Sequence, residues 1–427
     1  MHWEHTATAA AAMTTLLAGA LLVGGPSAGI AQRPEPEHAP GATPSVTPTP
    51  EPGETPARDP IRFRIVSAPD TWNTDLGDIT DASGWDPGEP NSINRPWRRE
   101  TDAVLDDMAR RKPRFVLVAG DLVQGRWDED ADGYGTFGSI ATLAGRERAV
   151  RRAARTYYGH WRAQFARHDL ATYPALGDHE LGDNWWDTAD ARALAPAFRD
   201  AWARAFTLRR RRPRFIHAMH PPARTQHAAT AYAFRSGPVL VVTIDPFHAR
   251  ADGTIHAEVV RSQLRWLDRV LRRAAADASV RFVVVQGHVP VLTTSRSTFS
   301  SELRLNDGAS SPFWRTLEKH GVDVYLAGEM HAVSTAHHGG VEQIVHGASL
   351  RYWRFNYLTI AVSASELRLS LRVAPISRRT EHRRLWQSTG HRPPASLRVG
   401  RFRVAGSMRI AADGGASDRR GLLRLRP

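Results

Sequence analysis

The chain has 427 residues, 41% of them hydrophobic, which suits one large folded domain with tails or two modest domains and excludes a wholly disordered protein. It has no cysteine, so disulfides, thiolate zinc sites and cysteine nucleophiles are excluded, and any metal ion must be held by His, Asp, Glu or Asn. The net charge of +13 is compatible with binding to an anionic partner.

The first 60 residues predict a targeting segment followed by a linker. Residues 6–30 are small and apolar like the hydrophobic region of a signal peptide, so residues 1–31 are expected to be a signal peptide or an N-terminal membrane anchor. Residues 32–60 are rich in Pro, Thr and Glu and predict an extended linker. The protein is therefore expected to be exported, either secreted or anchored at the outer face of the membrane; a tail without a targeting role is the alternative.

Strands alternate with helices between residues 61 and 375, which predicts one layered α/β domain. Strands are predicted from apolar residues in alternation or in continuous runs, and helices from apolar residues three and four apart. The predicted strands are 61–67, 115–119, 239–244, 282–285, 322–327, 343–345, 357–362 and 367–373. The predicted helices are one after Pro96, 146–167, 197–206, one around Leu267, and 313–320.

Residues 376–427 are expected to form a basic, Arg-rich C-terminal tail outside this domain. The segment has 13 arginines against three acidic residues, so most of the net charge lies there. Two interpretations stay open: a solvated basic end, or a tail that contacts an anionic surface, polymer or nucleic acid. No protein partner is implied.

Five apolar segments each end in a cluster of side chains that can bind a metal ion. Glycine lets the backbone turn tightly at such a position, and residues two apart on an extended segment, such as Glu329 and His331, point the same way. One cluster alone could be an ordinary turn, but five at strand ends indicate a metal site. The clusters are Asp70–Asp75, Gly120-Asp121, Gly177-Asp178-His179-Glu180, Gly287-His288 and Gly328-Glu329-Met330-His331.

The order of these motifs resembles that of the calcineurin-like metallophosphoesterases, over about Arg62 to Val373. The resemblance implies a four-layer αββα sandwich that hydrolyses a phosphate mono- or diester, with a hydroxide bridging two divalent ions (Mn, Fe, Mg or Zn). It implies that Asp121 bridges the ions. One ion would be held by Asp121, Asp178, His288 and Glu329, and the other by Asp70, Asp121, His331 and Asn73.

Three positions depart from the family pattern. Asn73 or Asp75 stands where a first-motif histidine is missing, Asp178 replaces an asparagine, and Glu329 replaces a histidine. The added carboxylates favour hard ions such as Mn²⁺ or Mg²⁺. Because every replacement can still bind a metal, an active enzyme is expected. The alternative is a weak or inactive module of the same fold whose basic tail binds an anionic polymer or surface.

The resemblance also implies a catalytic role for His179, which would stabilise the transition state or protonate the leaving group; the alternative is that it only orients Asp178. Arg126 and Trp127 follow the second motif and are expected to contact the substrate. Further residues expected to support the ligands are Glu180, Asp183 and His346.

Overall fold

The computed structural model describes residues 59–425, except residues 90, 132, 209–224, 298–299, 348–349, 351–352 and 383–391. The chain divides into two units, Met1–Ala57 and Arg58–Pro427. The predicted signal or anchor segment and nearly all of the predicted linker lie outside the described residues. Within the described part, no helix is both long and apolar enough to cross a membrane.

One sheet combines three parallel strands from the first half of the chain with strands from its C-terminal part. Its order is β16-β15-β13-β12-β1-β2-β3, and β14 also pairs with β13. Strands β1, β2 and β3 run parallel, and β2 is buried along its whole length, as its apolar run predicts. The bounds are β1 (Phe63–Ser67), β2 (Phe115–Val118), β3 (Thr172–Pro174), β12 (Arg354–Val362), β13 (Glu366–Thr380), β14 (Pro394–Val399), β15 (Arg403–Ala411) and β16 (Ala416–Gly421).

A second sheet has the order β10-β11-β9-β8-β5-β4. Its central strands β5, β8, β9 and β11 are parallel and are built from buried Val, Ile and Leu runs. The bounds are β4 (Tyr232–Ser236), β5 (Val239–Thr243), β8 (Phe282–Gln286), β9 (Val324–Ala327), β10 (Ser334–His338) and β11 (Val341–Val345), with a separate hairpin of β6 (Phe247–Ala249) and β7 (Ile255–Ala257).

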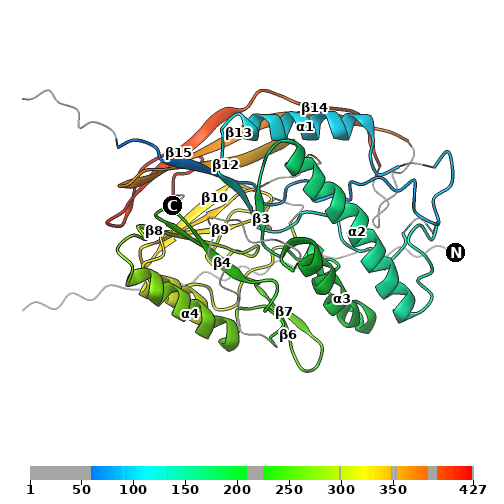
Figure 1. Ribbon diagram of the computed structural model, residues 1–427, viewed down its shortest axis with the longest axis horizontal. Coiled ribbons are helices and arrows are strands. Elements are labelled where there is room, and N and C mark those ends of the chain that lie inside the picture. The colour runs from blue at the N-terminus through cyan, green and yellow to red at the C-terminus, as the bar shows by residue number, and fades with distance from the viewer. Residues whose placement is uncertain are drawn as a thin grey trace, which may run out of the picture. The chain divides into compact units, whose positions relative to one another are not determined.

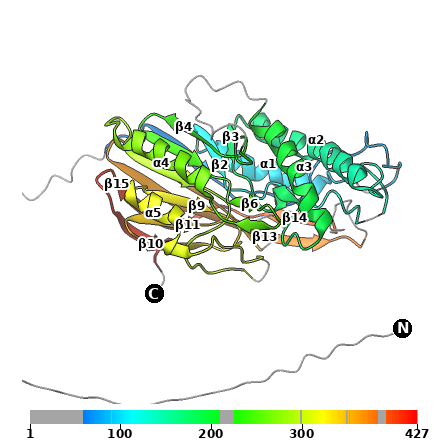
Figure 2. The same ribbon diagram turned by 90° about the horizontal axis from the view of Figure 1, so that it is seen from below.

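The helices cover the outer faces of the two sheets. Helix α1 lies over the first sheet and α4 beneath the second in Figure 1, and Figure 2 shows α5 beside α4. Helices α2 and α3 pack against each other. The predicted αββα sandwich is therefore confirmed. The bounds are α1 (Arg95–Ala109), α2 (Leu143–Arg167), α3 (Ala189–Phe206), α4 (Arg261–Ala275) and α5 (Pro312–Lys319).

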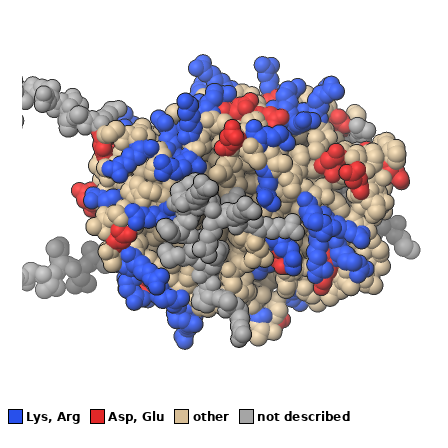
Figure 3. All heavy atoms as spheres, viewed as in Figure 1, with Lys and Arg blue, Asp and Glu red and all other residues tan. Residues whose placement is uncertain are grey.

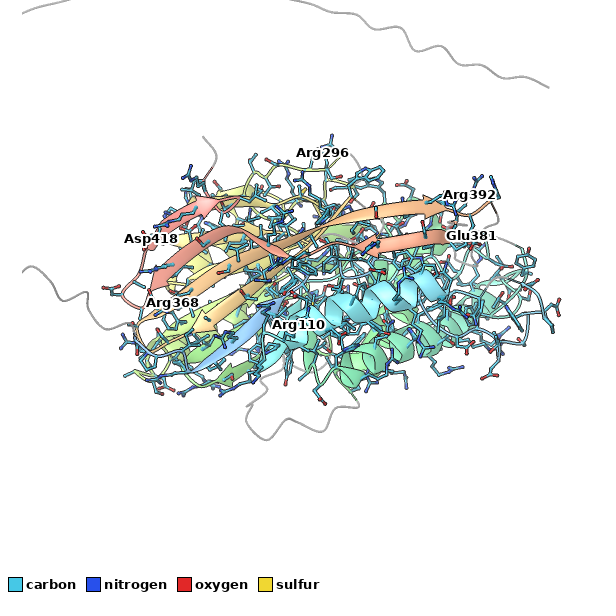
Figure 4. The ribbon with its side chains drawn as sticks, turned by 90° about the horizontal axis from the view of Figure 1, so that it is seen from above. Arg110, Arg296, Arg368, Glu381, Arg392 and Asp418 are labelled. Atoms are coloured by element: carbon cyan, nitrogen blue, oxygen red, sulfur yellow. The ribbon has the colours of Figure 1, made fainter. Side chains whose placement is uncertain are left out.

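The predicted tail boundary at residue 375 is wrong, because the described part of residues 376–427 belongs to the fold. Strand β13 runs on to Thr380, and β14, β15 and β16 extend the first sheet. Figure 4 shows Glu381 and Arg392 at one end of this layer, away from Arg368 and Asp418. Every second residue of β15 from Gly406 to Ile410 is buried, so this arginine-rich segment has the period of a half-buried strand.

Contacts on both sides hold these C-terminal strands in place. On α1, Arg99 donates to the carbonyl of Leu397 at 2.7 Å, and Glu100 accepts from the amide of Val399 at 2.8 Å. Near the second sheet, Thr335 Oγ1 donates to the carbonyl of Arg424 at 2.9 Å. Basic charge is also not confined to this region, since Figure 3 shows Lys and Arg side chains spread over the whole visible face.

Removal of residues 1–57 is expected to leave the protein folded, with any phosphate-releasing activity of the full chain unchanged, because the second unit begins at Arg58. Circular dichroism and a phosphate-release assay check this expectation. Asp59 should be kept, since its carboxylate accepts from the amide of Ser365 at 2.8 Å. A variant that starts at residue 61 should therefore melt at a lower temperature than one that starts at residue 58. Loss of the circular dichroism signal in the longer variant would show that the first unit is needed for folding.

Candidate metal centre

The predicted ligands all follow the carboxyl ends of parallel strands, where α/β sheets place their sites. Asp70 and Asn73 follow β1, Asp121 follows β2, and Asp178 follows β3. The second sheet contributes residues after β8 and β9, namely His288, Glu329 and His331. Side chains from five separate segments therefore meet between the two sheets.

An unusual backbone conformation marks the site. Five of the predicted ligands have a positive φ: Asp70 (52°), Asn73 (38°), Asp121 (58°), Glu329 (68°) and His331 (47°). Only a few per cent of residues other than glycine adopt such angles, at a cost of about 1–3 kcal/mol each where the strain is real. The surrounding structure holds these residues in strained conformations, as is typical of functional sites.

Two glycines let the segments approach closely enough to form the site. A Cβ atom at Gly120, whose φ is 83°, would lie 2.5 Å from Nδ1 of His288. A Cβ atom at Gly177 would collide with the Asp121 carboxylate. The glycines of the strand-end motifs are thus needed because side chains from neighbouring segments occupy the adjacent space.

One group of ligands surrounds Nε2 of His288. The Nδ1–H of this ring donates to the carbonyl of Ala119 at 2.7 Å, which leaves Nε2 facing the site. Nε2 lies 3.0 Å from Asp178 Oδ1, 3.2 Å from Asp121 Oδ1 and 3.2 Å from Glu329 Oε2. Ligands that share an ion at about 2.0–2.2 Å lie roughly 3.0–3.4 Å apart, so these atoms fit one divalent ion.

A second group lies on the other side of Asp121. Ligand atoms of Asp70, Asp121 and His331 lie within 4.8 Å of one another. The side-chain amide of Asn73 lies between two of them, 3.1 Å from Asp121 Oδ2 and 3.4 Å from His331 Nε2. Asp75 instead accepts from the amide of Gln124 at 3.0 Å. Of the two residues that the sequence left open, Asn73 is thus the one beside this group, although the atom that makes these contacts is the donor Nδ2 and not the ligand oxygen Oδ1.

The electrostatics of the buried carboxylates fit a site for cations. Asp70 Oδ2, Asp121 Oδ1 and Asp178 Oδ1 are buried without a hydrogen bond, which is costly unless a cation offsets the charge. Burial raises the pKa of Asp70 to about 7. Burial and the charge of Asp178 also raise the pKa of Asp121 well above its usual range. Hard carboxylate oxygens with two imidazoles are a set of donors that suits divalent ions.

His179 lies beside the shared carboxylate. Its Nδ1–H donates to the carbonyl of Gln124 at 2.6 Å, so Nε2 faces the site, 3.7 Å from Asp121 Oδ2. Burial lowers the pKa of His179, but the charges of Asp183 and Asp178 outweigh that effect and raise it above its usual value. The ring can therefore present a proton on Nε2 toward a group bound at the metal centre.

The residues predicted to support the ligands do so in different ways. The Glu180 carboxylate accepts from the backbone amides of Gly177, Asp121 and Leu122 at 2.7, 2.9 and 2.8 Å, and so ties the second and third motifs together. Asp183 lies 3.8 Å from Nδ1 of His179. The Nε2 of His346 contacts Ser67 Oγ at 3.0 Å, on strand β1.

Arg126 and Trp127 have different environments, although both were predicted to contact the substrate. The side chain of Arg126 is 39% exposed and lies 3.9 Å from Asp183, at the edge of the site. Trp127 is buried against Tyr157, Tyr158 and Phe198. The prediction for Trp127 is therefore wrong, because an indole enclosed in an aromatic cluster cannot reach a substrate.

These two neighbours are expected to respond oppositely to replacement by alanine. Trp127→Ala should lower the free energy of unfolding by about 3–5 kcal/mol, because it empties a buried aromatic site. Arg126→Ala should change it by no more than about 1 kcal/mol, as expected for an exposed ion pair, and should instead raise KM. Urea denaturation and steady-state kinetics separate the effects. A stable Trp127→Ala variant with a raised KM would restore the original prediction.

Two polar side chains beside the centre carry no motif of their own in the sequence. Asn184 donates to Asp178 Oδ2 at 2.6 Å, and Ser301 Oγ donates to Glu329 Oε1. They are 117 residues apart and meet at 2.7 Å. A contact of this kind depends on the tertiary fold, so sequence patterning gives no signal for it.

Solved structures that match this chain include proteins described as phosphatases. A dimetal phosphatase from Danio rerio has a TM-score of 0.42 at 13% identity, over 73% of this chain and 96% of that one. PhoD has a TM-score of 0.49 at 12% identity, over 87% and 73%. A Staphylococcus aureus protein described as a 5′-nucleotidase has a TM-score of 0.36 at 12% identity, over 79% and 54%.

No family model and no curated protein matches the sequence. The layered αββα architecture implied by the sequence is nevertheless confirmed by this chain's own sheet order and flanking helices. Similarities at this level of identity and TM-score assign no activity to this chain. The chemistry of the centre therefore rests on the residues of this chain.

Proposed function

We propose that this chain is a metal-dependent hydrolase of phosphate esters that holds two divalent ions on either side of Asp121. The observation that supports the proposal best is that two groups of ligand atoms share this one carboxylate. Asp121 belongs both to the group with Asp178 and His288 and to the group with Asp70 and His331. Its Oδ1 lies 3.2 Å from His288 Nε2, and its Oδ2 accepts from Asn73 Nδ2 at 3.1 Å. Each oxygen thus faces a different group.

The side chains around the centre would have different roles in the reaction. Two bound ions would supply a water molecule of lowered pKa and would neutralise the phosphate. His179 presents Nε2 beside Asp121 and can give its proton to the leaving oxygen. Arg126 is exposed at the edge and can contact the phosphate or its organic group. Glu180 keeps the backbones of two motifs in register through three amide hydrogen bonds.

Hydrolysis of model substrates tests the proposal. Purified protein should release nitrophenol from a nitrophenyl phosphate monoester or a bis-nitrophenyl diester after loading with Mn²⁺, Mg²⁺, Fe²⁺ or Zn²⁺. A chelator should abolish the activity, and added metal should restore it. Absence of turnover with every metal and both esters would overturn the proposed function.

The metal preference should shift when the two unusual carboxylates are replaced by the residues typical of the family. The double change Asp178→Asn and Glu329→His removes two negative charges from one group and adds an imidazole. Imidazole suits zinc, whereas carboxylates suit Mg²⁺ and Mn²⁺. Competitive loading should show relatively more zinc in the variant. The pH at half-maximal rate should also fall, because fewer negative charges oppose ionisation of a bound water. If neither quantity moves, Asp178 and Glu329 do not serve the same ion.

Binding of an anionic partner is a second candidate function. The sequence suggested a free basic tail for this role, whereas the candidate surface is part of the fold. Among the described C-terminal residues, Arg379, Arg398, Arg401 and Arg403 are exposed on or next to β13, β14 and β15. Binding to heparin beads at increasing salt, compared between the natural chain and a variant with these four arginines changed to glutamine, tests this candidate. Equal elution of the two proteins would contradict it. Export of the protein stays a prediction from residues 1–31.

A further inference from the structure

A chain of three hydrogen bonds joins the two carboxylates that set this centre apart. Asn184 Nδ2 donates to Asp178 Oδ2 at 2.6 Å and to Ser301 Oγ at 2.7 Å. Ser301 Oγ in turn donates to Glu329 Oε1. Asn184 follows the third motif, and Ser301 lies on the segment between β8 and β9, so the contact closes one side of the centre.

Each of these carboxylates has one oxygen held by the protein and one oxygen directed at the centre. Asp178 accepts from Asn184 through Oδ2, while Oδ1 lies 3.0 Å from His288 Nε2. Glu329 accepts from Ser301 and from the amide of Leu303, 3.2 Å away, through Oε1. Its Oε2 lies 3.2 Å from the same His288 nitrogen. The hydrogen bonds therefore decide which oxygen of each carboxylate faces an ion.

A carboxylate is well suited to each end of the chain of hydrogen bonds through Asn184 and Ser301. A neutral amide or imidazole at these positions would offer a single acceptor atom, so it could not present one atom to an ion and a separate acceptor atom to a donor. A carboxylate has two acceptor oxygens and can do both. Donors from Asn184, Ser301 and Leu303 also offset part of the negative charge that two buried carboxylates bring into one group.

The backbone beside both residues is strained in a similar way. Asp183, next to Asn184, has a φ of 71°, and Glu302, next to Ser301, has a φ of 66°. Residues other than glycine persist at such angles only when surrounding contacts hold them there. The two loops are thus fixed where their side chains meet.

We infer that Asn184 and Ser301 are positioning residues that fix Asp178 and Glu329 as one-oxygen ligands of the same ion. The inference rests on the proposed two-ion centre. Glu329 Oε1 also accepts from the Leu303 amide at 3.2 Å and from Ser300 Oγ at 3.4 Å, so loss of Ser301 removes one of three donors. Loss of either Asn184 or Ser301 should loosen the orientation of its carboxylate and weaken metal binding, typically by 10–100-fold for partners of metal ligands.

Metal titration of matched variants tests the inference without depending on activity. Ser301→Thr keeps the hydroxyl and should bind Mn²⁺ as the natural protein does, whereas Ser301→Val has nearly the same shape without the hydroxyl and should bind one ion about 10–100-fold more weakly. Asn184→Ala should behave like Ser301→Val, and Asn184→Asp should be at least as weak because a second carboxylate would face Asp178. Asn306→Ala, an exposed asparagine of the same segment, is the control.

Dissociation constants from competition with a fluorescent chelator decide the outcome, once circular dichroism has shown that the variants are folded. The double variant Asn184→Ala and Ser301→Val should lose less affinity than the product of the single losses, since both residues act through one contact. Equal Mn²⁺ affinity of Ser301→Val and Ser301→Thr would overturn the inference. A natural protein that binds two Mn²⁺ ions yet hydrolyses no ester would overturn the proposed function alone. The same titration would still decide whether Asn184 and Ser301 position the two carboxylates.

Discussion

Replacement of Asp121 by alanine is expected to abolish metal binding and ester hydrolysis together. Its two oxygens face different groups of ligands, so one substitution removes a ligand from both ions. Loss of a shared ligand should cost far more than the 10–100-fold typical of a supporting residue. Elemental analysis of the purified variant and a phosphate-release assay check both effects.

A matched control makes the Asp121 result specific. Asp413 is an exposed aspartate far along the chain, and Asp413→Ala should keep the natural metal content and rate. An Asp121→Ala variant that is folded and keeps more than about a tenth of the natural rate would contradict a shared carboxylate, since the expected loss exceeds that of a supporting residue.

Replacement of His179 by alanine is expected to lower kcat by about 10²–10⁴-fold while leaving the metal content unchanged. Its Nε2 lies 3.7 Å from Asp121 Oδ2, which is farther than the 3.0–3.2 Å that separate His288 Nε2 from three carboxylate oxygens. If the ring protonates the leaving group, the loss should be smaller for a nitrophenyl ester than for an alkyl ester, because nitrophenolate leaves without a proton. An equal loss with both esters would assign His179 to phosphate binding instead. A loss of metal would assign it to positioning Asp178.

The pH profile gives a separate check on the protonation of His179. Burial lowers the pKa of this ring, whereas the charges of Asp183 and Asp178 raise it, with a net shift upward. A raised pKa keeps the acid form present at higher pH, so activity should fall only as the pH rises through that value. Asp183→Asn removes one raising charge, and the alkaline limb of the profile should therefore move to lower pH. An unchanged alkaline limb would show that another group sets it.

The sequence predicted the elements that carry the ligands because those elements have strong local signals. Strand β2 is a continuous apolar run, and the glycine after it is required by the nearby His288 ring. The C-terminal strands were missed for a physical reason. Their many arginines suggested a solvated tail. The alternation of buried residues at Gly406, Met408 and Ile410, which is the pattern of a half-buried strand, was therefore overlooked.

The parts of the site that could not be predicted depend on distant contacts. Trp127 follows Arg126 directly, and only the packing of α2 and α3 buries one and leaves the other exposed. The choice of Asn73 over Asp75 also depends on the fold, because Asp75 turns toward the Gln124 amide. The contact of Asn184 with Ser301 joins two loops from different sheets and has no local pattern.

The most direct test of the shared centre is a crystal structure of the Mn²⁺-loaded protein with anomalous scattering measured at the manganese edge. We expect two anomalous peaks about 3.5–4 Å apart, the separation found in known two-ion sites, with one oxygen of Asp121 on each. His288 and Glu329 should contact one peak, and His331 the other. A single peak, or two peaks that do not share Asp121, would contradict it.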